Sequence, residues 1–323
     1  MLLRSVPPGL QMTRFRERYE EIYTLLTRTE LQQGSAGLDA LSALPDLFGQ
    51  DDELWLGFYT EDGLRIALEK YGFMRDLERI GFRDRRLELR TDDPDEHLLR
   101  IWSDKPHCDA PLVELVVRRD FLQAPGLGDQ PTTHIPVLNI EWLLLQNPAT
   151  DFSPERPPLP GQRYPGLGVG PQVMELLRNV CQRLELGALV TVPSYFHNAI
   201  FYSEEFRHFD PYWQGAFLAL CRDVMPQAEG SVAASSWGLY WEMVENKNAP
   251  KKQPFDWFQQ LMVYPISERL RAYFDTRDYQ REVQQGLSDH DFLLHTEPLT
   301  QTLAARGISP LNNERIDVWI DDV

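Results

Sequence analysis

The chain has 323 residues, of which 42% are hydrophobic and 25% are charged, a composition that excludes a disordered chain and allows a sizeable core. Its formal net charge of −17 at pH 7 opposes non-specific binding to nucleic acid or anionic membranes, because both partners are themselves negative. The same charge suits a cationic amine substrate, and it equally suits mere solubility.

The start of the chain and its hydropathy predict a cytoplasmic protein that does not bind membranes. No apolar run approaches the ~20 residues that cross a bilayer, and the first residues, MLLRSVPPGL, lack the pattern of a secretory signal. The three cysteines, Cys108, Cys181 and Cys221, are far apart and form no CxxC pair. They indicate neither a disulfide framework nor a zinc site.

The first part of the chain reads as helical. Phe15, Tyr19, Ile22 and Leu26 recur at helical spacing, and a loop-like stretch over residues 34–52 follows. The apolar run Leu54–Tyr59 is interpreted as a short strand. A second helical stretch runs from about Leu64 to Ile80 and is interrupted near Gly72. We interpret residues 1–85 as a helical extension that covers one face of a sheet.

From residue 86 onward the hydrophobic pattern changes to that of strands. Four are predicted, at Leu87–Arg90, His97–Ser103, Leu112–Arg119 and Val137–Leu145. The turn signal Asp92–Asp95 makes the first connection. Short connections between successive strands favour an antiparallel meander.

A segment rich in proline and glycine, residues 148–170, precedes a helix with well-defined ends. Gly170 is a plausible N-cap, Pro171 fits the first helical turn, and Gly187 ends the helix. The run Ala188–Val192 then reads as a buried strand. Together these segments predict antiparallel strands, a glycine loop, a helix and a further strand, in that order.

The remaining chain is predicted to alternate helices with short strands. A helix begins at Asp210-Pro211 and runs through Val224, and residues 266–304 are mainly helical. Strands are expected at Trp237–Val244 and Phe258–Tyr264, and a final one at Ile316–Ile320. The acidic and histidine-containing segment Asp289–His295 is interpreted as a solvated helix start, not as a metal site.

The segment with the clearest chemistry is RYPGLGVG, residues 163–170. Glycines at alternate positions let the backbone approach a ligand and point several N–H groups in one direction. The N-terminus of the following helix adds positive potential, which suits a pyrophosphate, although a tight turn without a ligand has the same pattern. The spacing matches neither the dinucleotide-binding fingerprint nor a Walker loop.

This segment resembles the pyrophosphate loop of the GNAT N-acetyltransferase superfamily, whose pattern is Arg/Gln-x-x-Gly-x-Gly/Ala. Arg163-Tyr-Pro-Gly166-Leu-Gly168 fits that pattern, between the long strand 137–148 and an amphipathic helix. The stretch VTVPSYFHNAIFYSEEF, residues 190–206, looks like the family's Asn…Ala…Tyr helix. The resemblance covers roughly residues 87–209. It implies a mixed α/β fold, with a mostly antiparallel central sheet flanked by helices and further helical segments at both ends.

The resemblance also implies roles for particular residues. Tyr202 is expected to protonate the departing thiolate as a general acid, and Asn198 to contact the arm of the cofactor, which is acetyl-CoA or another acyl-CoA. The remaining expected cofactor-binding residues are the strand residues Leu143, Leu144 and Leu145 and the loop residues Arg163, Tyr164, Gly166, Leu167, Gly168, Val169 and Gly170.

A general base must also take up the proton of the attacking amine. Glu141 is the candidate, because a carboxylate in a half-buried apolar cleft has a pKa closer to neutrality. One step in strand register turns this side chain to the other face, and an ordinary ion pair with an arginine is an equal alternative. No metal is expected at the site.

The sequence therefore predicts a GNAT-like core over residues 86–265, with a helical insertion near 210–225, followed by a helical extension over 266–323. We expect an acyl-CoA-dependent N-acyltransferase that acts on a small-molecule or protein amine. Asn198 directly precedes Ala199, and Tyr202 follows Ala199 one position earlier than in the family. A non-catalytic acyl-CoA sensor on the same fold is therefore the alternative, and a structural protein in which the glycines only form a turn is the third.

Overall fold

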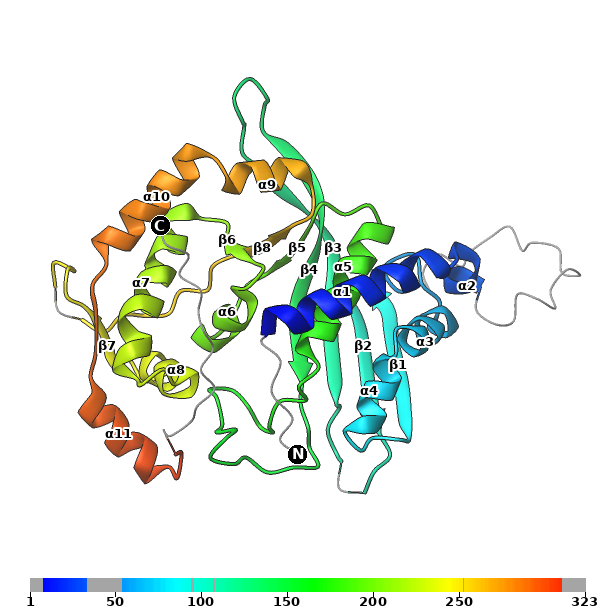
Figure 1. Ribbon diagram of the computed structural model, residues 1–323, viewed down its shortest axis with the longest axis horizontal. Coiled ribbons are helices and arrows are strands. Elements are labelled where there is room, and N and C mark those ends of the chain that lie inside the picture. The colour runs from blue at the N-terminus through cyan, green and yellow to red at the C-terminus, as the bar shows by residue number, and fades with distance from the viewer. Residues whose placement is uncertain (1–7, 34–53, 94–95, 107, 252, 310–323) are drawn as a thin grey trace, which may run out of the picture. The chain divides into compact units, whose positions relative to one another are not determined.

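The computed structural model describes residues 8–33, 54–93, 96–106, 108–251 and 253–309 (Figure 1). The chain forms two compact units, each assembled from separate segments. The first unit comprises Met1–Leu122, Ile135–Ala149 and Gly166–Leu189; the second comprises Gln123–His134, Thr150–Pro165 and Val190–Val323. The division into residues 1–85, 86–265 and 266–323 stays a prediction.

The strands of the first unit follow one another in the sheet in chain order. They are β1 (Arg85–Asp93), β2 (Glu96–Ser103), β3 (Val113–Ala124), β4 (Thr133–Leu145) and β5 (Ala188–Thr191). The pairs β1–β2 and β2–β3 are antiparallel, with Leu99 opposite both Leu89 and Leu115. Because consecutive strands pair antiparallel in chain order, the predicted meander is confirmed for these three strands.

Within the described residues, five helices belong to the first unit. They are α1 (Pro8–Leu25), α2 (Arg28–Gln33), α3 (Glu61–Lys70), α4 (Phe73–Arg79) and α5 (Gly170–Arg183). The predicted break near Gly72 is confirmed, because Gly72 has a φ of 81° between α3 and α4. Thr60 caps α3, and its hydroxyl accepts a hydrogen bond from the Gly63 N–H at 3.0 Å.

The strand expected at Leu54–Tyr59 is wrong, because these residues form a tight turn. The Trp55 N–H donates to the Tyr59 carbonyl at 2.8 Å. Leu56 and Gly57 have φ values of 55° and 65°, a left-handed backbone that reverses the chain. Trp55 and Leu56 are nevertheless buried, so their apolar character reflects burial in a turn and not a strand.

An ion cluster joins α1 to α5. The buried carboxylate of Glu175 accepts hydrogen bonds from Arg16 Nη2 at 2.9 Å and from Arg178 Nε at 2.8 Å. Glu175 is only 1% exposed, and a buried carboxylate is tolerated only when such partners satisfy it. The cluster therefore holds the N-terminal helix on the helix that follows the glycine loop.

The second unit holds the other described helices and, among its described residues, two short antiparallel strand pairs. Its helices are α6 (Phe196–Tyr202), α7 (Pro211–Gln227), α8 (Val232–Tyr240), α9 (Glu268–Phe274), α10 (Arg277–Asp289) and α11 (Thr296–Ala305). The strands β6 (Arg207–His208) and β8 (Met262–Pro265) pair antiparallel, as do β7 (Val244–Asn246) and β9 (Phe292–Leu294).

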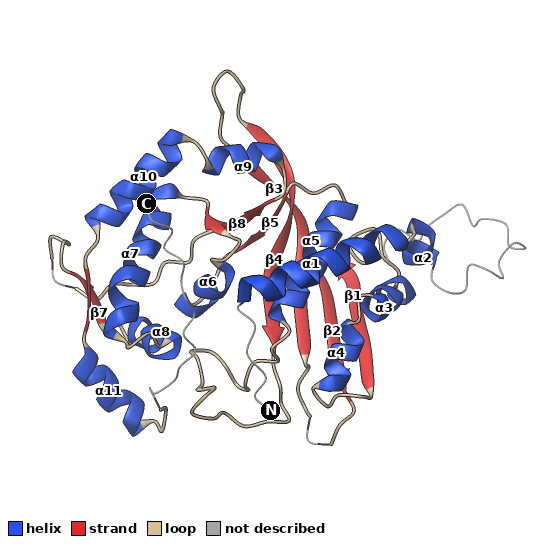
Figure 2. Cartoon of the chain, viewed as in Figure 1, coloured by secondary structure: helices blue, strands red, loops and turns tan. Residues whose placement is uncertain are grey.

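The sheet order in this unit is β5-β8-β6, and β5 contributes residues to both units. In the part of the chain that the structure describes, the main sheet counted through β5 has seven strands, and helices flank the strands in each unit (Figure 2). The predicted fold class is confirmed as a mixed α/β structure with a mostly antiparallel sheet, helices around it and additional helices toward both ends.

Two of the expected later strands differ from the structure. Most of Trp237–Val244 lies in α8 and the turn after it, because the Ser231 hydroxyl caps a helix that begins at Val232. Of Phe258–Tyr264, only the part from Met262 onward is a strand. The helix expected from Asp210 is confirmed, with the Asp210 carboxylate accepting from the Trp213 N–H. The strand expected at Ile316–Ile320 lies outside the described residues.

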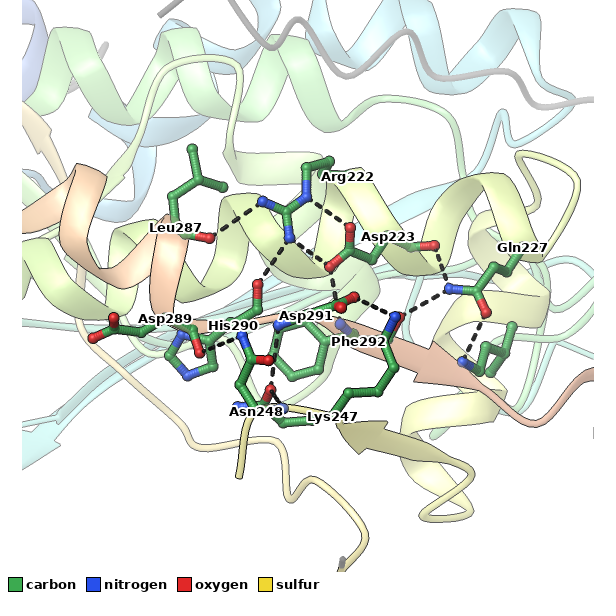
Figure 3. Close-up of polar contacts among 12 residues, drawn as sticks. Arg222, Asp223, Gln227, Lys247, Asn248, Leu287, Asp289, His290, Asp291 and Phe292 are labelled. Carbon is green, nitrogen blue, oxygen red and sulfur yellow. Dashed lines mark hydrogen bonds and ion pairs between the residues drawn. The ribbon is translucent and has the colours of Figure 1, made fainter. Parts of the chain in front are cut away.

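A polar network ties α7 to β9 and to the end of α10 (Figure 3). Arg222 of α7 donates to the main-chain oxygens of Leu287 and His290, at 3.2 and 2.8 Å. The carboxylate of Asp223 accepts from the Phe292 N–H at 2.9 Å. Asp291, from the segment considered for metal binding, pairs with Lys247 at 2.6 Å. These contacts give this polar segment a structural role.

Candidate functional site

The glycine loop is fastened to the end of β4, within the first unit. The Leu167 N–H donates to the Leu145 carbonyl at 3.2 Å, and Gln146 forms an antiparallel bridge with Gly166. Gln146 is itself held by its side chain, which donates to the Pro111 carbonyl at 2.9 Å. The loop thus continues from the sheet as an ordered segment, and it carries the backbone directly into α5.

The loop alternates buried and exposed residues. Leu167 and Val169 are 4% and 1% exposed and anchor the loop in the core, whereas Gly166 and Gly168 lie at the surface. A Cβ added at either of these two glycines would meet no atom within 4 Å. Gly168 also has a φ of +77°, which favours glycine. Open space therefore lies directly over the exposed backbone.

The N-terminus of α5 offers unpaired donors to that space. In the described chain, the N–H groups of Gly168, Val169 and Gly170 donate to no backbone acceptor, and no side chain caps the helix. Pro171 occupies the first turn and has no N–H to satisfy. Free donors at the positive end of a helix form a site for an anion such as a phosphate.

The strand β4 is longer than its neighbour β5. The Gly187 N–H donates to the Pro136 carbonyl at 2.7 Å, and β5 has four residues while β4 has thirteen. The half-buried Leu143, Leu144 and Leu145 form the last part of β4, directly before the segment that leads to the glycine loop.

Glu141 occupies a different environment from the half-buried cleft expected for a general base. Its side chain is 40% exposed and pairs with Arg118 Nε at 2.8 Å. The Asn139 amide donates to the same carboxylate oxygen at 2.9 Å. These contacts agree with the alternative that the sequence left open, in which Glu141 forms an ordinary ion pair with an arginine.

Four other predicted site residues belong to the second unit. Arg163 is exposed, and its guanidinium lies 5.2 Å from the centre of the Tyr164 ring. Asn198 lies in the first turn of α6, where its N–H donates to the Tyr195 carbonyl at 3.1 Å. Tyr202 ends α6 and packs 5.3 Å from the Phe206 ring. Burial raises the pKa of Tyr202 to about 12, so its phenol keeps its proton at neutral pH.

Two histidines of the second unit that the sequence did not single out as site residues are buried. His197 Nδ1 lies 2.8 Å from Ser236 Oγ, which fits the expectation that such histidines satisfy a local hydrogen bond. His208 is fully buried, and within the described ranges neither of its ring nitrogens has a hydrogen-bond partner. Burial lowers the pKa of both rings to about 3. No spacing signal distinguishes them from other histidines.

In the described ranges, no three His, Cys, Asp or Glu side chains come together in a group suited to a metal ion. No helix in these ranges combines the length and apolar character needed to cross a membrane.

Comparison with known proteins adds weak structural similarities, of which two are described here. Neither protein-family models nor curated sequences match the chain. One similar structure is AtaT complexed with acetyl-methionyl-tRNAfMet, with 13% identity over 38% of this chain and 85% of that one, at a TM-score of 0.25. Another is a bacterial toxin with 12% identity over 66% of this chain and 84% of that one, at a TM-score of 0.27. TM-scores this low carry no conclusion about activity.

Proposed function

We propose that this protein is an acyl-CoA-dependent N-acyltransferase, which transfers an acyl group directly from the thioester to an amine. The observation that carries the proposal is the exposed loop Gly166–Gly170, with unpaired N–H groups and open space at the N-terminus of α5. The loop bridges to the residue after β4, and its sequence fits the pyrophosphate pattern of the GNAT superfamily.

The proposed binding uses main-chain groups for most contacts. The N–H groups of Gly168, Val169 and Gly170 bind the pyrophosphate, and Arg163 adds a positive charge. Main-chain groups of Leu143–Leu145, at the end of β4, pair with the pantetheine arm as an added strand would. Asn198 contacts the same arm. Acetyl-CoA is the cofactor that we propose first, and a longer acyl-CoA has the same anchoring groups.

The proposed reaction needs two proton transfers. The bound thioester supplies an activated acyl carbon. The amine nitrogen attacks that carbon, the carbon–sulfur bond breaks, and the sulfur leaves as a thiolate. Tyr202 donates its phenolic proton to the thiolate, which the protonated state of its buried ring permits. Glu141 accepts the proton that the amine loses. Holding amine and thioester together contributes most of the rate.

A second candidate function is a non-catalytic acyl-CoA sensor. The ion pair of Glu141 with Arg118 favours it, because the carboxylate oxygen that a general base would use already contacts a guanidinium. This alternative keeps the same cofactor loop and differs only in the absence of turnover.

The acceptor is proposed from chemistry alone. The net charge of −17 suits a cationic small-molecule amine or a protein amine, and it opposes nucleic acid and anionic membranes as partners. The tRNA in the AtaT structure is a ligand of AtaT and is not assigned to this chain. A cytoplasmic location is likewise part of the proposal.

The first experiment is a calorimetric titration of the protein with acetyl-CoA, followed by an assay of thiol release with a panel of amines. Saturable binding with turnover supports the acyltransferase, and saturable binding without turnover supports the sensor. Absence of binding by a folded protein contradicts both and leaves a loop that is only a turn.

A further inference from the structure

The strand β1 forms one edge of the main sheet. It pairs antiparallel with β2 and, within the described residues, with no other strand (Figure 2). Its nine residues make it longer than the average strand of about 5–6 residues. An edge strand presents a row of unpaired main-chain groups, so this edge is a place where a strand of another chain can join the sheet.

The main-chain groups of β1 point alternately toward β2 and away from it. The Asp104 N–H donates to the Asp84 carbonyl at 3.1 Å, directly before the strand. The pairing with β2 keeps one register over Arg85–Arg90, so every second residue counted from Asp84 bonds to β2. The N–H and C=O groups of the residues between them, such as Leu87 and Leu89, therefore point away from β2.

The charges of β1 make the strand complementary to a reversed copy of itself. Its sequence is RRLELRTDD, residues 85–93, which begins with two arginines and ends with two aspartates. An antiparallel copy centred on Leu89, the middle residue, brings every charge opposite an opposite charge. The facing pairs are Arg85 with Asp93, Arg86 with Asp92, and Glu88 with Arg90. An in-register parallel copy would instead place each charge opposite an identical one, which is unfavourable.

The antiparallel register also matches the outward main-chain groups. Leu89 lies opposite Leu89 of the copy, and both present their N–H and C=O groups to each other. Glu88 and Arg90 then form non-hydrogen-bonded pairs, in which the Cα atoms are only about 4.5 Å apart and the side chains meet. The shift in register between Arg90 and Asp93 lies outside these central pairs. Hydrogen bonding and charge therefore select the same alignment.

The two central charged residues are available for these contacts. Arg90 is exposed, and among the described residues its side chain has no hydrogen-bond or ion-pair partner. The half-buried Glu88 carboxylate accepts from Trp102 Nε1 at 2.6 Å and from Arg100 Nη1 at 3.4 Å. A carboxylate has about four acceptor positions, so Glu88 is held in place and still accepts a hydrogen bond from an opposite arginine.

We propose that β1 pairs with β1 of a second copy of this chain, antiparallel about Leu89, so that the sheets of two first units become continuous. Main-chain hydrogen bonds supply the association, and the charged pairs fix its register and direction. The strand carries three positive and three negative charges, so the contact surface is neutral although each chain has a net charge of −17. This interface does not depend on the proposed acyl transfer.

The test is sedimentation equilibrium of the full chain over roughly 1–300 μM protein, at about 0.15 M salt to screen the net charge. We expect a reversible monomer–dimer equilibrium with a Kd of roughly 10–100 μM, because a single strand pair is a small interface. Hydrogen exchange locates the contact. The amide hydrogens of Leu87 and Leu89 exchange more slowly as the protein concentration rises through the Kd.

Charge exchange tests the register. Arg90→Glu and Glu88→Arg each place like charges in both central pairs and raise the Kd at least ten-fold. An equimolar mixture of the two variants dimerises again, because each central pair then joins an arginine of one chain to a glutamate of the other. Arg281→Glu makes the same change in net charge as Arg90→Glu at a position that is 70% exposed and outside β1, and it leaves the Kd unchanged.

A main-chain variant serves if Glu88→Arg does not fold. Leu89→Pro removes an N–H that points away from β2, a position at which an edge strand tolerates proline. It raises the Kd at least ten-fold without removing a hydrogen bond to β2. Circular dichroism confirms that each variant is folded.

Three results would overturn the proposal. A monomer at every concentration shows that the charges of β1 keep this edge unpaired. A dimer that is unaffected by Arg90→Glu, with no dependence of Leu89 exchange on concentration, uses another surface. Folded single variants that do not dimerise when mixed contradict the antiparallel alignment about Leu89.

Discussion

Gly215 of α7 and Gly286 of α10 lie in contact where the two helices cross. A Cβ added at Gly286 would come within 3.2 Å of the Gly215 Cα and would overlap the main chain of Tyr212. A Cβ added at Gly215 would likewise overlap the main chain of Val283. The close approach of these two helices therefore depends on the absence of side chains at both positions.

The first prediction concerns this crossing. Gly215→Ala and Gly286→Ala each lower the free energy of unfolding by about 2–4 kcal/mol, because backbone atoms of the opposite helix cannot move away without shifting the helix. Urea unfolding at neutral pH measures the change. The matched control is Gly166→Ala, where an added Cβ meets open space. A loss below about 0.5 kcal/mol in both helix variants contradicts the prediction.

The second prediction concerns the buried carboxylate in the α1–α5 ion cluster. Glu175→Gln leaves Arg16 and Arg178 without their anion and lowers the free energy of unfolding by about 3–5 kcal/mol. Glu61→Gln is the control, because its ion pair with Arg65 is exposed and is worth little. The same urea titration compares the two. Equal effects of both substitutions would show that burial adds nothing to the Glu175 cluster.

The third prediction is a loss of stability in acid. The pKa of His197 and His208 is about 3 in the folded chain and about 6.5 in the unfolded chain. Between pH 6.5 and pH 3 these histidines are protonated in the unfolded chain but neutral in the folded chain. The free energy of unfolding is therefore highest above pH 6.5 and decreases as the pH is lowered toward 3. Each ring contributes a loss of about 2 kcal/mol between pH 7 and pH 5.

Replacing one of these histidines tests the sign and the size of the predicted loss of stability in acid. In His208→Leu, the difference in unfolding free energy between pH 7 and pH 5 shrinks by about 2 kcal/mol. His134→Gln is the control, because it replaces an exposed histidine and not a buried one. A His208→Leu protein with the full acid loss would refute the assignment of that loss to His208.

The fourth prediction concerns the glycine loop. A glutamate at Gly166 or Gly168 places a carboxylate over the unpaired N–H groups of α5, and acetyl-CoA binding falls by at least ten-fold through charge repulsion and occupation of the site. Gly128→Glu is the matched control, because Gly128 also has positive φ and open space. Calorimetry measures all three variants. Equal affinity in the control and the loop variants places the cofactor elsewhere.

The fifth prediction separates chemistry from binding. Tyr202→Phe keeps the ring that packs on Phe206 and removes only the proton donor, so kcat falls by about 10²–10⁴-fold while the Kd for acetyl-CoA stays within about two-fold of wild type. Tyr212→Phe is the control, because its phenol contacts exposed Asp289. Unchanged kcat in Tyr202→Phe removes Tyr202 from the mechanism.

Glu141→Gln tests the general base in the same assay. As a base, Glu141 gives a rate that rises with pH through its titration, and the glutamine variant loses that limb of the profile. A protein in which Glu141 only pairs with Arg118 keeps the wild-type pH profile after the substitution.

Much of the first unit could be predicted from local sequence. The strands β1 to β4 and the break at Gly72 follow from alternation and from turn residues, which act over a few positions. Pro171 and the flanking glycines marked the start of α5 to within one residue. Errors arose in the short apolar runs Leu54–Tyr59 and Trp237–Val244, because periodicity cannot distinguish a buried turn, a helix and a strand over so few residues.

The sequence by itself determined the glycine loop, since glycine spacing and the helix start are local properties of consecutive residues. Only the tertiary structure decided which side chains meet. It paired Glu141 of β4 with Arg118 of β3, and it placed Trp55 and Arg183 around one cavity. Contacts between distant residues depend on how the elements pack, and the chain gives no periodic or spacing signal for them.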